Sequence, residues 1–324
     1  MAASYSTGTA TGPTDLLQKL VTWLVAQGWT QNMSQADGTG WRAHLSKSGT
    51  YINLRATPGA EGGSVVWAGG VYNPLLGGIG LYVGTGYSGA SAWNAQAGGP
   101  IGNGAAYTIG SFMQTSNSAL TAYHFFDDGA DNIVVVVERT SGIFTHMGWG
   151  TTLTKAGAWT GGAYFFAPFA GAFGGSTSLA GSASVAADCP FAYQDRQGGT
   201  ASFVRADVDT FTGKWLSNGT TTIASYGYTG KLAASAFGPG TIPPEIPNYN
   251  TFKDRQVSAL NSQANLLPIR VFAARGGSGY SLLGDVPSIF LSNGVGNGLN
   301  TGTIYSIGAE NFMAFPNFMV KKGA

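Results

Sequence analysis

Glycine is the residue that most constrains this chain, since it supplies 51 of the 324 residues and recurs between aromatic residues along the whole length. The glycines follow no three-residue period, which excludes a collagen helix. Aromatic residues make up 12% of the chain, which argues against simple disorder. We therefore expect short strands bounded by glycine, asparagine, aspartate or proline.

Charge is scarce and balanced. Charged residues make up 10% of the chain, where about 25% is usual, and the formal net charge is +1. This balance gives no electrostatic footprint for nucleic acid or an anionic membrane, so neither is expected as a partner. Cys189 is the only cysteine, which excludes an intramolecular disulfide, and we expect it to be a small buried residue. The first residues lack the pattern of a secretory signal, and the apolar runs are shorter than the ~20 residues of a membrane span.

One strong helix signal occurs, in "TDLLQKLVTWLVAQG", with Thr14 as the expected N-cap and Gly28 as the expected C-terminal cap. The fold class is predicted to be mainly β (α+β). A tail over 1–12 leads into a small α/β unit over 13–115, followed over 116–324 by a glycine-rich antiparallel sandwich or barrel-like domain. A proline-rich arm is expected at 238–250, and a second helix is possible at 251–265.

Strand patterns recur along both units. We predict strands at 41–46, 51–57, 64–68, 106–113, 120–126, 132–139, 142–149, 162–166, 202–206, 221–225, 268–273, 287–291 and 303–307.

Two long uncharged loops, 69–104 and 167–186, contain many aromatic residues. An uncharged loop of about 35 residues is expected either to contact another chain or to be mobile, and the aromatic residues favour contact. The candidate assembly contacts come from these loops, from the adjoining strand and from the proline-rich arm. They are Trp67, Tyr72, Tyr82, Tyr87, Trp93, Phe169, Phe173, Pro243, Pro244, Pro247 and Tyr249.

The segment "YHFFDDGADNIVVVVER" gathers Asp127, Asp128 and Asp131 near His124, and His146 follows on the next predicted strand. The Asp-Gly pair favours a tight turn between two strands, and aspartate bonds its own backbone in such turns. A calcium loop would end in a bidentate glutamate, and zinc would need a third ligand, so the turn interpretation is preferred over a metal site. Phe126 and His124 are expected on one face of their strand.

Other catalytic patterns are weak. The loop "GGSGYS" at 276–281 only approximates a nucleophile elbow, and the stretches "GNGAAYTIG" and "GVGNGLNTG" resemble phosphate loops in glycine content alone. The sequence therefore predicts no catalytic residue, no cofactor and no metal site.

Four blocks together resemble structural proteins of tailed-bacteriophage virions, from the tail, neck (collar) or baseplate. The blocks are "QGWT" at the end of the helix, "YHFFDDGADNIVVVVERTSGIFTHMGWG", "WTGGAYFFA" and "LLGDVPSIFLSNGVGNGLNTGTIYSIGAENFMAFPNF". The resemblance implies a non-enzymatic subunit, made in the host cytoplasm and built into a ring or sleeve of the virion. Its partners would be further copies of itself and other virion proteins.

Two alternatives come from other functional classes. A carbohydrate- or receptor-binding module would use Trp67, Trp93, Trp159 and Trp215 to stack on sugar rings, with burial of these side chains as the competing interpretation. A hydrolase would need an acid pair across a cleft, for which Asp207 and Asp209 are the best spaced. The other acids considered lie mostly in turn contexts: Asp127, Asp128, Asp131, Asp188 and Asp195.

Overall fold

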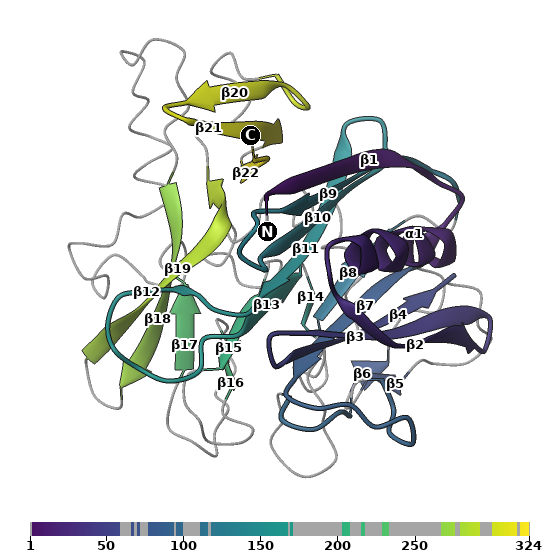
Figure 1. The fold of residues 1–324 in the computed structure, drawn as a ribbon, viewed down its shortest axis with the longest axis horizontal. Coiled ribbons are helices and arrows are strands. Elements are labelled where there is room, and N and C mark those ends of the chain that lie inside the picture. The colour runs from purple at the N-terminus through teal and green to yellow at the C-terminus, as the bar shows by residue number, and fades with distance from the viewer. Residues whose placement is uncertain are drawn as a thin grey trace.

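The computed structural model describes residues 2–58, 66–67, 70–71, 77–93, 95–99, 111–115, 118–167, 169–170, 203–207, 215–217, 229–232, 267–275, 279–291, 300–315 and 318–323. Within these residues the fold is mainly β, with one helix and three antiparallel sheets (Figure 1). The predicted fold class is confirmed. The predicted helix at 251–265, the strand at 221–225 and the arm at 238–250 lie outside the described residues.

The central sheet has the order β1-β9-β10-β11-β13-β15-β16. Its strands are β1 (Ser4–Ala10), β9 (Leu120–Asp127), β10 (Ile133–Thr140), β11 (Ile143–Gly150), β13 (Tyr164–Ala167), β15 (Phe203–Asp207) and β16 (Trp215–Ser217). Residues 4–10, predicted as part of a tail, instead form β1 and pair with β9. This strand had no apolar alternation to reveal it, because its sequence is "SYSTGTA".

The N-terminal sheet has the order β14-β8-β7-β4-β3-β2. Its strands are β14 (Phe169–Ala170), β8 (Ser111–Gln114), β7 (Gly78–Gly84), β4 (Thr50–Thr57), β3 (Gly40–Lys47) and β2 (Thr30–Asp37). A separate two-stranded ribbon pairs β5 (Val66–Trp67) with β6 (Gly70–Val71). The prediction that 69–104 is one loop is wrong, because β7 lies in its middle, between β4 and β8.

The C-terminal sheet has the order β17-β18-β19-β22-β21-β20, and the short strand β12 also pairs with β19. Its strands are β17 (Thr229–Leu232), β18 (Leu267–Arg275), β19 (Gly279–Leu291), β22 (Phe318–Lys321), β21 (Glu310–Phe315), β20 (Ile304–Ile307) and β12 (Thr154–Lys155).

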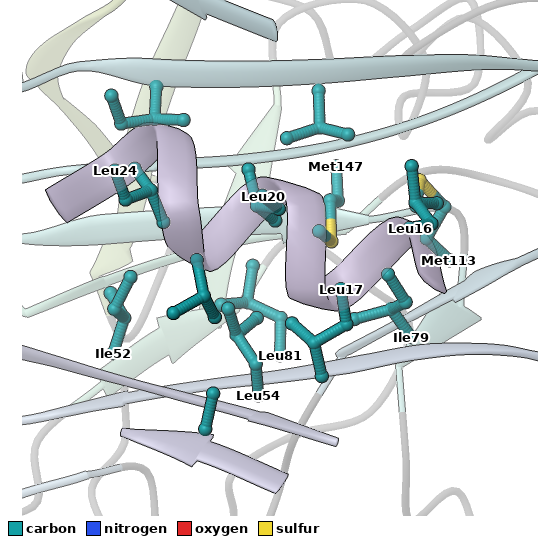
Figure 2. Packing of buried hydrophobic residues seen from close by; sticks show 14 of the residues in the cluster. Leu16, Leu17, Leu20, Leu24, Ile52, Leu54, Ile79, Leu81, Met113 and Met147 are labelled. Carbon is teal, nitrogen blue, oxygen red and sulfur yellow. The ribbon is translucent and has the colours of Figure 1, made fainter. Parts of the chain in front are cut away.

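Helix α1 (Pro13–Ala26) lies between the central and N-terminal sheets (Figure 1). Its buried leucines contact Ile52, Leu54, Ile79 and Leu81 of the N-terminal sheet, with Met147 of the central sheet close by (Figure 2). Each fully buried leucine contributes about 2–3 kcal/mol of transfer free energy, so the two sheets and the helix form one core. This core spans the predicted boundary at residue 115.

The predicted C-terminal cap of α1 is confirmed, and the predicted N-cap is wrong. The N-cap is Gly12 rather than Thr14, because Pro13 occupies the first turn, where its missing N–H costs nothing. Asp15 accepts the N–H of Thr11 at 2.8 Å instead. At the other end Gly28 has φ 80°, and its N–H and that of Trp29 bond to the carbonyls of Val25 and Leu24, a Schellman motif.

The central sheet is covered on both faces. Ile133, Val135 and Val137 of β10 belong to the core around α1, whereas Val134 and Val136 belong to a second core shared with β19, β21 and β22. A strand buried on both faces is apolar at every position, which accounts for the run "IVVVV".

Glycine makes room for aromatic rings in this sheet. Gly148 and Gly150 of β11 lie opposite Phe166 and Tyr164 of β13. A Cβ atom on Gly148 would lie 2.3 Å from the Phe166 ring, and one on Gly150 would lie 2.4 Å from the Tyr164 ring. The two rings are stacked with an interplanar angle of 4°. The alternation of glycine and aromatic residues thus has a packing function here.

Candidate functional site

The segment Asp127–Asn132 joins β9 to β10 as a tight turn, as predicted. Asp127 Oδ1 accepts the N–H of Gly129 at 2.7 Å, and Asp128 Oδ1 accepts the N–H of Ala130 at 2.8 Å. Gly129 and Asp131 have φ values of 83° and 64°. Glycine adopts this left-handed conformation without strain, and aspartate tolerates it better than most residues.

The carboxylates of this turn also join three parts of the fold. Asp131 Oδ1 lies 2.6 Å from Lys47 Nζ, and its Oδ2 accepts the hydroxyl of Ser48 at 3.0 Å, both at the β3–β4 hairpin. Asp128 Oδ2 accepts the hydroxyl of Ser288 on β19 at 2.5 Å. We call Asp127, Asp128, Asp131 and Asn132 the acidic junction, because they connect the N-terminal and C-terminal sheets to the central one.

Asn132 extends the acidic junction to β13. Its Nδ2 donates to Asp128 Oδ2 at 2.8 Å, and its Oδ1 accepts the hydroxyl of Tyr164 at 3.0 Å. Burial raises the pKa of Tyr164 well above its usual value, and the Asp128 carboxylate raises it further. The phenol is therefore held as a proton donor to Asn132.

The Asp127 carboxyl of the junction is buried. Asp127 is 1% exposed, and burial raises the pKa of its carboxyl above the usual value. The hydrogen bond from the Gly129 N–H and the charge of Lys47 lower this pKa. The charges of Asp128 and Asp131 raise it. Its Oδ2 is buried without a hydrogen-bond partner. Perturbed carboxyls occur at active sites and also in structural networks. The other contacts of this junction hold the backbone of the turn or link strands, which favours the structural role.

The two histidines beside the junction lie in a row on one face of the central sheet. Val136 of β10 is the register partner of both His124 and His146. Tyr5 Oη lies 2.8 Å from His124 Nδ1, and the His146 ring lies between Phe166 and Phe318 at 6.2 and 5.7 Å. Burial lowers the pKa of His124, and Glu138 raises it.

Within the described ranges, no three histidine, cysteine, aspartate or glutamate side chains are grouped to hold a metal ion. Cys189 lies outside these ranges, as do Asp188, Asp195 and Asp209. Asp207 ends β15, where its backbone bonds Gly162 and Ala163 at 2.7 and 2.8 Å. The helix of the described part does not have the length and apolar character of a membrane span.

Two candidate assembly contacts are buried in their own chain. Tyr82 is 1% exposed and Trp93 is 7% exposed, so the prediction that they face a neighbour is wrong for both. Tyr82 lies on β7 and is covered by the residues that follow this strand, which include Trp93, so both side chains are buried without another chain. Tyr87 is half-buried and contacts His44, with ring centroids 4.9 Å apart.

The remaining aromatic candidates are placed only in part. Trp67, Phe169 and Trp215 lie on β5, β14 and β16. Trp159 is half-buried; its Nε1 donates to the Leu283 carbonyl at 3.0 Å, and Lys155 Nζ lies 4.7 Å from its ring centroid. Other candidates lie outside the described residues: Tyr72, Phe173, Pro243, Pro244, Pro247 and Tyr249.

Sequence reasoning missed a buried polar row on the N-terminal sheet. Met33, His44, Asn53 and Tyr82 are successive register partners across β2, β3, β4 and β7. His44 and Asn53 are 1% and 0% exposed. The available signal was the alternation in "AHLSK" and "YINLR", which places both polar residues opposite the leucine face.

No protein-family model matches this chain, and a search of curated proteins finds no match.

Proposed function

We propose that this chain is a structural subunit of a tailed-phage virion that acts through contacts between copies rather than through catalysis. The resemblance described above supports this role. Three of its blocks correspond to β9–β11, to β13, and to β19–β22 with their connections, which together supply the core between the central and C-terminal sheets.

The observation that carries the proposal is the edge strand β20. In the described part of the C-terminal sheet, β20 has β21 on one side and no strand on the other. Its sequence "IYSI" has no charge and no proline, and its register with β21 is regular. Natural edge strands are usually protected by charges, prolines or bulges, and an unprotected edge can pair with another chain.

The edges β1 and β2 differ from β20. Both contain register irregularities, at Gly8–Ala10 and at Gln31–Met33. Lys19 Nζ also donates to the carbonyl of Thr9 on β1 at 2.9 Å. Bulges and a lysine discourage edge pairing, so among these three edges the contact between copies is assigned to β20.

The side chain beside the open edge supports the same assignment. Ile304 is 44% exposed, and only Val25 on α1 is another large hydrophobic side chain exposed among the described residues. Such a side chain would be buried when a second copy pairs with β20. A ring or sleeve needs a heterologous contact, in which β20 of one copy meets a different surface of the next copy, repeated around a closed rotational symmetry.

The test is mass photometry over a concentration series, with negative-stain imaging of any assembly. We expect rings or tubes from the wild type and loss of assembly for Ile304→Lys. Val25→Lys is the matched control, because Val25 has the same exposed fraction, 44%, but lies on the helix. A wild type that stays monomeric at high concentration, or equal loss of assembly in both variants, would contradict the proposal.

A further inference from the structure

The loop after β7 covers the buried polar row of the N-terminal sheet. We call residues 85–93 and 95–99 the covering loop. Its ends are joined by the N–H of Thr85 and the carbonyl of Ala97 at 2.9 Å. A Cβ atom on Gly99 would lie 2.2 Å from the Tyr82 ring, so the loop lies directly on the sheet.

Gln96 holds the covering loop together from within. It is 4% exposed; its Oε1 accepts the N–H of Ser88 at 2.6 Å, and its Nε2 donates to the carbonyls of Ser88, Ser91 and Ala92. The loop therefore has its own internal order and can move as a unit about its ends. Its contacts with the sheet include Tyr87 against His44 and the Tyr82 hydroxyl on the Gln96 carbonyl at 3.3 Å.

The hydrogen bonds around His44 fix which ring nitrogen carries its proton. Asn53 Nδ2 donates to the Tyr82 carbonyl at 3.1 Å, so Asn53 Oδ1 is the atom that faces His44. The distance from Oδ1 to His44 Nδ1 is 2.6 Å, and because Oδ1 only accepts, Nδ1 carries the hydrogen. In the neutral ring Nε2 is then bare, and it is buried without a hydrogen-bond partner.

A second proton on His44 would have no acceptor among the residues that the structure describes. It would create a buried N–H with a positive charge, which is costly without a partner. Met33, the neighbour of His44 on β2, is uncharged, and Tyr87 of the covering loop contacts His44 with its aromatic ring. Arg42 on β3 opposes the added charge. Asp37 on β2 attracts it, but Arg55 already pairs with Asp37 at 2.8 Å.

We propose that the covering loop is a pH-sensitive lid: protonation of His44 at Nε2 releases it from the N-terminal sheet. Opening exposes the polar row and the Tyr87 ring, which otherwise lies against His44. Burial lowers the pKa of His44 in the closed form, in agreement with this direction. The inference does not depend on the proposed virion role.

Hydrogen–deuterium exchange of the full chain between pH 7.5 and 5.0, corrected for the intrinsic pH dependence, tests the lid. Below about pH 6.5, where a solvent-exposed histidine titrates, exchange in 85–99 should rise with a slope approaching tenfold per pH unit, the limit for one proton. Exchange in β3 and β4 should not rise with it. No rise in 85–99, or an equal rise in the strands, would overturn the inference.

Two variants locate the proton. His44→Asn keeps a donor toward Asn53 but cannot titrate, so its covering loop should stay protected at pH 5.0. His124→Asn, at a half-buried histidine of the central sheet whose pKa is also lowered, should keep the wild-type response. A response that persists in His44→Asn contradicts the lid.

Because His44→Asn changes a buried side chain, a measurement on the wild type serves as a second, independent test. The ring nitrogens of His44, followed by NMR, should titrate with the same midpoint as the exchange of 85–99. Different midpoints would overturn the inference.

Discussion

At the scale of single residues, the glycines of β11 show why this chain contains so many. Gly148 lies between Val134 and Phe166 in the register, on the face that meets the C-terminal sheet. A glycine facing an aromatic residue across strands lets the ring lie flat over the backbone. The same pairing recurs at Gly8 and Tyr123, where a Cβ atom would lie 2.7 Å from the tyrosine hydroxyl.

Gly148→Ala should therefore destabilise the fold. The new Cβ would lie 2.3 Å from the Phe166 ring and 2.6 Å from the Ile133 carbonyl, so both the ring and the backbone must shift. We expect a loss of about 1–3 kcal/mol in the free energy of unfolding, measured with denaturant. Gly157→Ala is the control, since nothing lies within 4 Å of its Cβ position, and it should change stability by less than about 0.5 kcal/mol. Equal effects would refute the packing role.

At the scale of elements, the acidic junction does more than close a hairpin. Asp128 accepts hydrogen bonds from two backbone N–H groups of its own turn, from Asn132 Nδ2 and from Ser288. Ser288 adopts φ 70°, which is uncommon for a residue other than glycine. The bond to Asp128 helps to hold Ser288 in that conformation, so one carboxylate fixes both the turn and the path of β19.

Asp128→Ala should cost roughly 2–3 kcal/mol in the free energy of unfolding, because several partly buried donors lose their acceptor. Glu138→Ala is a suitable comparison, since Glu138 accepts a single exposed backbone N–H, from Gly142 at 2.8 Å, in the next turn. We expect its loss to stay below about 1 kcal/mol. Chemical denaturation of both variants checks the difference, and a cost for Asp128→Ala no larger than that for Glu138→Ala would argue against the junction.

The sequence predicted the local part of this junction and not its distant partners. The Asp-Gly pair was enough for the turn, because its backbone bonds lie within a few residues. Ser288 and Lys47 could not be assigned as partners, because nothing in the sequence indicates which distant strand or turn lies beside the junction. Likewise β1 was missed because "SYSTGTA" has no apolar alternation, and β7 was missed because its alternating Ile79, Leu81 and Val83 lie in a glycine-dense stretch that resembles a loop.

At the scale of the whole molecule, the sheets form layers in which titratable groups lie at contacts. His124 of the central sheet touches Phe315 of the C-terminal sheet, with ring centroids 5.4 Å apart, and Tyr5 of β1. Burial lowers the pKa of both His124 and His44 in the fold, which favours the neutral ring at each site. Stability is thereby coupled to pH across two separate contacts.

We expect the free energy of unfolding to fall as the pH is lowered below about 6.5. In that range the unfolded chain binds protons at these histidines, while the folded chain does not until the lower folded pKa is reached. Asp127 acts in the opposite sense, because its raised pKa lets the folded form bind a proton first. Denaturation at pH 7.5, 6.5 and 5.5 checks the trend, and His124→Asn should make it shallower. A trend unchanged in this variant would contradict the role of His124.

The bond between Asp128 and Ser288 joins residues separated by 160 positions. At synthesis rates of about 5–20 residues per second, the second partner leaves the ribosome roughly ten to thirty seconds after the first. During that interval β9–β11 can pair, but Phe126, Val134 and Val136 have no C-terminal sheet to cover them. The nascent chain thus carries an exposed apolar surface until β19–β22 emerge, and in that interval a chaperone can bind before the last layer closes.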